Sequence, residues 1–207
     1  MPRRTGSSQR WKQRQERDIY VELAERAGWR SRAVFKLEQI QAKERLLKSG
    51  TVCVDLGSAP GSFSQLAARL VGATGRVIAV DLLPMEPIPG VEFLQGDFTA
   101  PETLQALRAR LAGQPVDLVM SDMAPNISGN RAIDQPRSMA LLDEALLFAR
   151  EVLRPGGDFL VKAFQGEGVD AFTRELKTLF KTVKTIKPKA SRPESREIYL
   201  LARSYGM

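Results

Sequence analysis

The stretch TVCVDLGSAPGSFSQLAARLV (51–71) decides the fold. It opens with a short apolar run, turns at DLGSAPG (55–61) and continues in an amphipathic helical pattern, so it predicts a strand–turn–helix unit. An apolar strand that ends in an acid before a glycine-bearing turn is typical of a site for a nucleotide-like ligand. The other strands that join this unit, and the residues that select its ligand, lie further along the chain.

Apolar runs recur along the chain after this unit, with helical patterns between most of them. The runs are 76–81, 91–95, 116–122, 158–164, 182–187 and 197–202. Near-continuous apolar strands that alternate with amphipathic helices predict an α/β fold, with a mostly parallel sheet wound on both faces.

The last two runs depart from this rule. Only about nine residues separate 182–187 from 197–202, whereas a parallel crossover needs a dozen or more. The final strand is therefore expected to run antiparallel to its predecessor. Its first residue, Glu197, would then lie at the edge where the parallel strands end.

Two segments precede this sheet. Residues 1–17 hold six Lys or Arg against one acid, Glu16, and predict a flexible basic arm. We expect residues 18–207 to form a single domain whose first part, 18–47, contains two helices. The first helical pattern ends in glycine, and the second opens on Ser31, a candidate N-cap. The second pattern places three apolar residues on one face: Val34, Leu37 and Ile40.

The composition of the 207 residues excludes several kinds of site. Histidine is absent, which removes Ser-His and Cys-His catalysis and most zinc sites, so we expect no metal. The lone Cys53 lies in an apolar run and is expected to be buried. No apolar run is long enough to cross a membrane, and no secretory signal is visible, so we expect a cytoplasmic protein. The net charge of +7 favours a polyanionic partner.

The turn at 55–61 lacks the spacing of two common phosphate-binding loops. It reads D-x-G-x-x-P-G rather than G-x-G-x-x-G, and the Gly-Lys-Ser/Thr of a P-loop is missing. Asp81 ends the next strand, where an acid suits a ribose diol, and Asp97 follows the third. Carboxylates without a phosphate cradle favour S-adenosylmethionine, which carries a ribose and an amine but no phosphate. The alternative for the turn alone is an ordinary connection between strand and helix.

Four polar residues stand out by position. Asp122 ends the fourth strand, Lys162 interrupts the buried fifth, Glu197 begins the last, and Lys36 lies at the rim of a buried helix face. Without histidine, lysine is the plausible base for a poorly nucleophilic hydroxyl. The alternatives are a snorkelling strand-end lysine, or an ion pair between Lys162 and Glu197, and for Lys36 an ordinary surface position.

At this point the sequence resembles the FtsJ/RrmJ-type ribose 2′-O-methyltransferases, which have a Rossmann-like fold with seven strands. The resemblance rests on motifs in the same order: SRAVFKL (31–37), DLGSAPGSFSQ (55–65), VDLVMSDMAPNISG (116–129), FLVKAF (159–164) and KPKASRPESREIYLLA (187–202). It implies a catalytic tetrad with Lys162 as proton acceptor, made of Lys36, Asp122, Lys162 and Glu197. It also implies contacts to S-adenosylmethionine from Gly57, Gly61, Phe63, Asp81, Asp97 and Asp122. The family turn commonly reads Pro-Gly-Gly-Trp, and Ser62 departs from it here.

The resemblance further implies the substrate, a uridine in the A-loop of 23S rRNA within the large subunit or its precursor, and a monomer. Basic residues of the arm, of 28–36 and of 187–196 are expected to face the RNA, and 128–138 is expected to be a polar loop on the substrate side. Three alternatives remain: methylation of tRNA, methylation of an mRNA cap, and a non-catalytic RNA-binding factor of ribosome assembly. Base N-methylation is disfavoured, because DMAP stands where its motif would follow the fourth strand.

Overall fold

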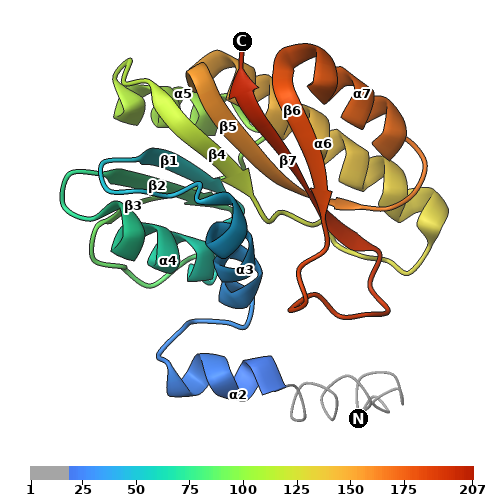
Figure 1. The fold of residues 1–207 in the computed structure, drawn as a ribbon, viewed down its shortest axis with the longest axis horizontal. Helices are drawn as coiled ribbons and strands as arrows, with labels where there is room; N and C mark the ends of the chain where they lie inside the picture. The colour runs from blue at the N-terminus through green and yellow to red at the C-terminus, as the bar shows by residue number, and fades with distance from the viewer. Residues whose placement is uncertain (1–18) are drawn as a thin grey trace.

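The structure, a computed structural model, describes residues 19–207, and the expected basic arm at 1–17 lies outside them. One sheet of seven strands in the order β3-β2-β1-β4-β5-β7-β6 forms its centre, with helices on both faces (Figure 1). The strands are β1 (Val52–Leu56), β2 (Arg76–Asp81), β3 (Val91–Gln95), β4 (Val116–Ser121), β5 (Leu153–Phe164), β6 (Phe180–Ile186) and β7 (Glu197–Tyr205). The helices are α2 (Ile19–Arg26), α3 (Val34–Glu44), α4 (Ser62–Val71), α5 (Pro101–Leu111), α6 (Arg131–Val152) and α7 (Val169–Leu179).

The final strand, β7, runs antiparallel to its neighbours, as the short connection before it predicts. β7 pairs antiparallel with β5 on one side and with β6 on the other, while the strands from β3 to β5 pair in parallel. The register places Glu197 opposite Phe164 and Tyr199 opposite Lys162. The start of β7 therefore meets the end of β5, and the predicted mostly parallel sheet with an antiparallel last strand is confirmed.

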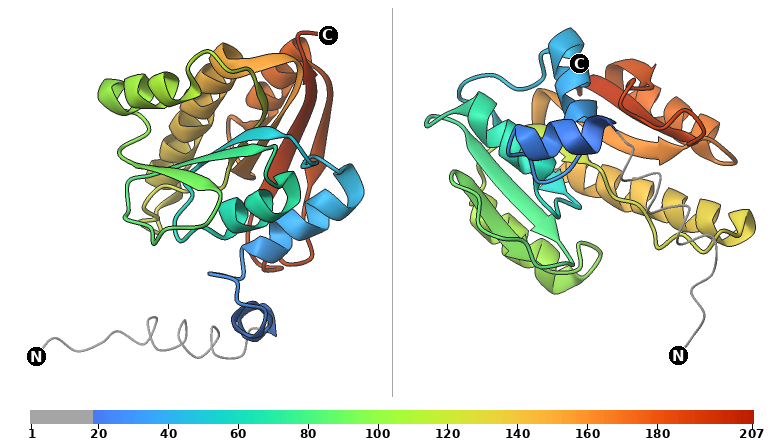
Figure 2. Two further views of the ribbon diagram at one scale, coloured as in Figure 1. Left: turned by 90° about the vertical axis from the view of Figure 1, so that its left-hand side faces the viewer. Right: turned by 90° about the horizontal axis from the view of Figure 1, so that it is seen from below.

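Each face of the sheet is covered by its own layer of helices. Helices α5, α6 and α7 pack on one face, and α3 and α4 pack on the other (Figure 2). Val34, Leu37 and Ile40 are buried along α3, as their spacing predicts. Cys53 is buried in β1 within the same layer. This layer sets α3 beside the sheet, so that its polar rim can reach the carboxyl ends of the strands.

Two local predictions were wrong. The segment 128–138 is not a loop throughout, because α6 begins at Arg131 and contains Pro136. Asn130 caps this helix by accepting a hydrogen bond from the Ala132 amide. Pro136 is the sixth residue of the helix, so it lacks the amide that would donate to the Ala132 carbonyl, yet the helix continues past it. Ser31 does not cap α3, which begins at Val34.

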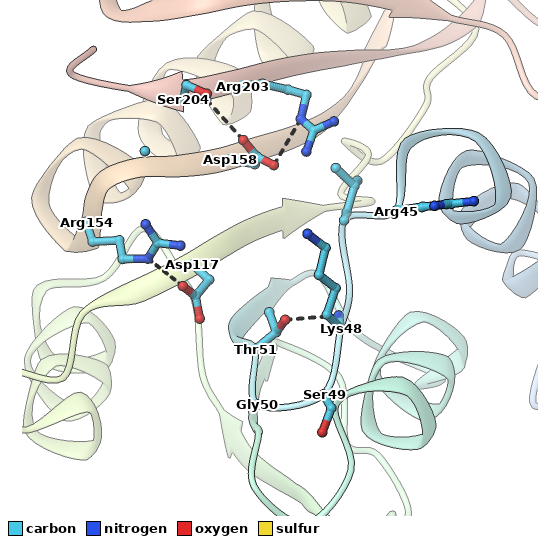
Figure 3. Close-up of a pocket in the computed structure, with 12 residues that line it drawn as sticks. Arg45, Lys48, Ser49, Gly50, Thr51, Asp117, Arg154, Asp158, Arg203 and Ser204 are labelled. Atoms are coloured by element: carbon cyan, nitrogen blue, oxygen red, sulfur yellow. Dashed lines mark hydrogen bonds and ion pairs between the residues drawn. The ribbon is translucent and has the colours of Figure 1, made fainter.

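The opposite, amino edge of the sheet carries a polar hollow of about 320 Å³ (Figure 3). Asp117 at the start of β4 accepts hydrogen bonds from the Val52 amide at 2.8 Å and from Nε of Arg154 at 2.5 Å. Asp158 in β5 likewise accepts from the Ser204 amide at 3.0 Å and from Nε of Arg203 at 3.1 Å. Asp117 thus connects the start of β4 to β1 and β5, and Asp158 connects β5 to the end of β7. We infer that these contacts stabilise the amino edge of the sheet.

We expect Asp117→Ala to lower the free energy of unfolding by about 1–3 kcal/mol, because the amide of buried Val52 loses its acceptor. Chemical denaturation measures the change. The control is Glu151→Ala, which removes an exposed ion pair with Arg108 and leaves no backbone amide unpaired. Equal losses in the two variants would contradict a fastening role for Asp117.

Among the helices described in 19–207, none is both long and apolar enough to cross a membrane.

Candidate functional site

Two lysine–carboxylate pairs lie at the carboxyl edge of the sheet. The Lys36 ammonium of α3 lies 2.7 Å from Oε1 and 2.8 Å from Oε2 of Glu197. The Lys162 ammonium of β5 lies 3.2 Å from Oδ1 of Asp122 and donates to the Asp122 carbonyl at 2.5 Å. Lys162 therefore pairs with Asp122, while Glu197, the partner named in the plain ion-pair alternative, is taken by Lys36. Their side chains are between 8% and 17% exposed, so all four are largely shielded yet reachable from one side.

Tyr199 contacts the Lys162–Asp122 pair and was not found from the sequence. Its hydroxyl donates to Oδ1 of Asp122 at 2.5 Å, the oxygen that Lys162 also approaches. Burial, and then the nearby Asp122 carboxylate, raise the pKa of Tyr199 well above its ordinary value, so the hydroxyl remains a donor. Because Tyr199 lies two residues after Glu197, both side chains stand on the same face of β7. In the sequence, this tyrosine reads as one more apolar residue of the strand.

The Glu197 carboxylate is held from a second side. Buried Ser191 donates from Oγ to Oε1 of Glu197 at 2.8 Å. The backbone of Ala190, just before Ser191, is held by α3 and by the residues that precede this helix. The Ala190 amide donates to Oε1 of Gln39 at 3.0 Å, and Arg32 donates to the Ala190 carbonyl. The 187–196 segment is thereby fixed against the tetrad, below the sheet in Figure 1.

The turn after β1 lies beside these pairs. Asp81 accepts from the Ala59 amide through Oδ2 and from the Leu83 amide through Oδ1, both at 2.8 Å. Gly57 has φ +75°, and a Cβ there would lie 2.3 Å from Cγ of Met123, just after Asp122. The glycine thus lets the turn after β1 approach the segment after β4, in a conformation that other residues rarely adopt.

The remaining predicted donor contacts flank the turn. Gly61 has φ +110°, and a Cβ there would lie 2.6 Å from Ile88 and 2.7 Å from Met85. Asp97 accepts one hydrogen bond from the Thr99 amide and one from the Thr99 hydroxyl. Both lower the pKa of Asp97, and the amide has the larger effect. Phe63 is buried and stacks on Tyr199 with ring centroids 6.4 Å apart, so it supports the site from the core.

Arg30, in a stretch expected to face RNA, also holds the turn after β1 from outside. Its guanidinium donates to the carbonyls of Pro60 at 3.1 Å, Glu86 at 2.6 Å and Pro87 at 2.7 Å. With Arg32 bound to Ala190 and Lys36 bound to Glu197, all three cations of 28–36 have protein partners. The three cations of this segment therefore help to hold the functional site in shape.

Asp55 is a buried acid directly before the turn. Its Oδ2 accepts from the Ser64 hydroxyl at 2.6 Å, and its Oδ1 has no partner among the described residues. Burial raises the pKa of Asp55 to about 7; the Ser64 hydrogen bond opposes this shift, and the charges of Asp122 and Asp81 add to it. Near neutral pH, a good part of this carboxyl is therefore protonated.

This shift predicts how stability depends on pH. The folded protein holds a proton on Asp55 that the unfolded chain releases near pH 4, so stability falls as pH rises from about 4 to about 7 and is flat above. We expect this group to contribute roughly 3 kcal/mol to the fall. Denaturation at pH 5 and pH 8 measures it, with Asp55→Asn as the reference that cannot ionise. A wild type and variant with parallel pH profiles would contradict the assignment.

The residues around the turn fit S-adenosylmethionine. The two oxygens of the Asp81 carboxylate each take one backbone amide, and a carboxylate offers about four acceptor positions, so two remain for ribose hydroxyls. Oδ2 of Asp97 has no hydrogen-bond partner among residues 19–207, and the lowered pKa of Asp97 favours the ionised carboxylate, which suits a hydroxyl or an amine. Asp122 adds negative charge where a cationic sulfonium would lie.

Comparisons with known proteins agree with this geometry. The profile of the FtsJ-like methyltransferase family matches residues 29–205. The chain is 56% identical over 205 residues to the ribosomal RNA large subunit methyltransferase E of Alkalilimnicola ehrlichii, covering 99% of this chain and 98% of that protein. A crystal structure described as a ribosomal RNA methyltransferase of Plasmodium falciparum superimposes with a TM-score of 0.77 at 30% identity, covering 86% of this chain and 98% of the other. The chain therefore belongs to the FtsJ-like methyltransferase family.

Proposed function

We propose that this protein methylates large-subunit rRNA, taking the methyl group from S-adenosylmethionine. In its finer form, the proposal is transfer to the ribose 2′-hydroxyl of a uridine in the A-loop of 23S rRNA. One observation carries it: the Lys36–Glu197 and Lys162–Asp122 pairs lie at the same sheet edge as the turn at 55–61. The name of the relative from Alkalilimnicola ehrlichii, a ribosomal RNA large subunit methyltransferase, supports the choice of RNA.

In this proposal Lys162 accepts the proton of the attacking hydroxyl. When bound near the turn, S-adenosylmethionine would supply a methyl group from its sulfonium sulfur, and the rest of the donor would leave as a neutral thioether. The ribose oxygen forms the new bond to carbon, and its proton passes to Nζ of Lys162, which must be the neutral amine rather than the ammonium when this step occurs. Asp122 holds this nitrogen through its carbonyl and its carboxylate, and Tyr199 holds Asp122 in turn. Positioning of this kind supplies a large part of the acceleration in a transfer that needs little acid catalysis.

The second pair, Lys36 and Glu197, shapes the other side of the proposed ribose site. Ser191 and Lys36 both bind Oε1 of Glu197, so the carboxylate has a fixed orientation. A fixed carboxylate beside a fixed ammonium offers an acceptor and a donor for the ribose hydroxyls. We assign these two residues the orientation of the nucleoside, and Lys162 the proton.

The test offers labelled donor together with three RNAs: large-subunit particles that lack the modification, naked 23S rRNA, and tRNA. The proposal expects label on the large-subunit rRNA, in the particle or as naked RNA. Label on tRNA alone would favour the tRNA alternative. RNA binding without any transferred label, using donor shown to bind, would favour a non-catalytic assembly factor and overturn the proposal.

A further inference from the structure

A small hollow lies next to the tetrad, at the end of β5. It measures about 50 Å³ and is formed by the segment after β4, the start of α6 and the ends of the β5–β7 pair. Its walls are Pro125, Ile127, Asp134, Gln135, Phe164 and Arg196. Neither the donor site nor the proton transfer uses this hollow. Its lining is mixed: three apolar side chains stand beside a carboxylate, an amide and a guanidinium.

Phe164 lies between the hollow and Lys162, the proposed proton acceptor. The Lys162 ammonium lies 6.0 Å from the centroid of the Phe164 ring, and Phe164 pairs in register with Glu197. Lys162 and Phe164 alternate by two along β5, so their side chains stand on one face of the strand. A group bound over Phe164 therefore lies within one nucleoside's length of the nitrogen that is proposed to take the proton.

Ile127 is an apolar side chain that the structure leaves in water, at 65% exposure. Its position is set, because the Asp134 carboxylate accepts hydrogen bonds from the Ser128 amide and hydroxyl, both at 2.8 Å, and from the Gly129 amide at 3.0 Å. The exposed isoleucine thus stands on a fastened segment directly after Asp122. Burying it beneath a flat ligand would remove apolar surface from water.

The floor of the hollow is also tied down. Gln135 donates from Nε2 to the carbonyls of Phe164 at 3.2 Å and Glu167 at 2.8 Å. Arg196 donates from Nη1 to the Gln165 carbonyl at 3.0 Å, which leaves further donors of its guanidinium for a ligand. The hollow is therefore held in shape before any ligand arrives.

We propose that this hollow is the seat of the nucleobase of the methylated nucleotide, an inference that rests on the function proposed above. The base is joined to the ribose carbon next to the one that bears the 2′-hydroxyl, so a hydroxyl at Lys162 brings its base to Phe164. The hollow is too small to enclose a base, so the base lies across its mouth, on Ile127 and Phe164. Arg196 donates to the base carbonyls. Splayed bases are commonly held in this way, by stacking and by edge hydrogen bonds.

Ile127→Ala tests the apolar contact. We expect kcat/KM for the RNA to fall about tenfold, because alanine buries less apolar surface against the base than isoleucine does, with the Kd for the donor unchanged. Leu147→Ala is the matched control: Leu147 is 62% exposed on α6, near the end that leads to the amino edge. Equal losses in the two variants, or none in Ile127→Ala, would overturn the proposal.

A substrate without the base gives the second measurement. An RNA fragment that contains the mapped nucleotide is made with an abasic residue at that position, its 2′-hydroxyl retained. Wild type is expected to lose about tenfold in kcat/KM on the abasic RNA, and Ile127→Ala is expected to lose much less from the same change, because the two removals share one contact. Losses that simply multiply would contradict the base seat. A wild type that methylates no RNA would instead end the proposed function, and this inference with it.

Discussion

Lys162→Ala is expected to reduce methyl transfer by at least about a thousandfold, because the proton of the attacking hydroxyl loses its acceptor. The donor should bind as in wild type, since the turn at 55–61, Asp81 and Asp97 are untouched. Single-turnover transfer to the RNA and calorimetric titration of the donor measure the two quantities. Lys177→Ala, which removes an exposed lysine of α7, is the control and is expected to leave both unchanged.

Lys162→Arg separates proton transfer from ion pairing. An arginine can keep a positive charge near Asp122, but it does not give up its proton in proteins and cannot act as the base. We expect this variant to fold and bind the donor, yet to be as inactive as Lys162→Ala. Activity within tenfold of wild type would show that Lys162 acts through its charge alone.

Lys36→Met is expected to have the largest effect on stability among the changes proposed here. It leaves the Glu197 carboxylate, whose side chain is 11% exposed, with the Ser191 hydrogen bond but without the ammonium of its ion pair. Removing one member of a largely buried pair should lower the free energy of unfolding by about 3 kcal/mol. Chemical denaturation measures this loss, and transfer assays measure the accompanying loss of activity.

The double variant Lys36→Met/Glu197→Gln distinguishes the two roles of the pair. Neutralising Glu197 removes the uncompensated charge, so most of the lost stability should return. Activity should not return, because neither the ammonium nor the carboxylate is then available to orient the ribose. A double variant as unstable as Lys36→Met would contradict the assigned ion pair, and an active one would contradict its orienting role.

The fold could be predicted closely because its signals are local. Each apolar run became a strand of the sheet, and the nine or so residues between 182–187 and 197–202 were too few for a parallel crossover. That one length predicted Glu197 at the carboxyl edge, and the structure places it there, opposite Phe164. The start of α6 was missed because RAIDQPRS is polar and contains Pro136, while its cap, Asn130, gives only a short signal.

The site could be predicted in its charged residues but not in how they are joined. Position alone brought Asp122, Lys162 and Glu197 to one edge, yet it left open which lysine pairs with which acid. Tyr199 escaped notice because its hydroxyl is invisible in a pattern that scores it as apolar, and Ser191 because it lies in a basic segment. Such links depend on register across the sheet and on how 187–196 folds back, and both are long-range properties.

The charge of 28–36 illustrates the same limit. A basic stretch predicts a surface for RNA, but Arg30 and Arg32 bind backbone carbonyls of the protein and Lys36 binds Glu197. Sequence gives the number of positive charges and not the direction in which they point. The cations of 187–196 lie on a segment that is itself fastened to Glu197, so they remain beside the tetrad.

We propose that the carboxyl edge of the sheet methylates a ribose oxygen. Its most direct test is mass spectrometry of the nucleosides released from large-subunit rRNA after reaction with isotopically labelled donor. We expect the label in 2′-O-methyluridine from one A-loop position, and we expect none when Lys162→Arg replaces wild type. Label in a base-methylated nucleoside, or in 2′-O-methyluridine formed equally well by Lys162→Arg, would contradict it.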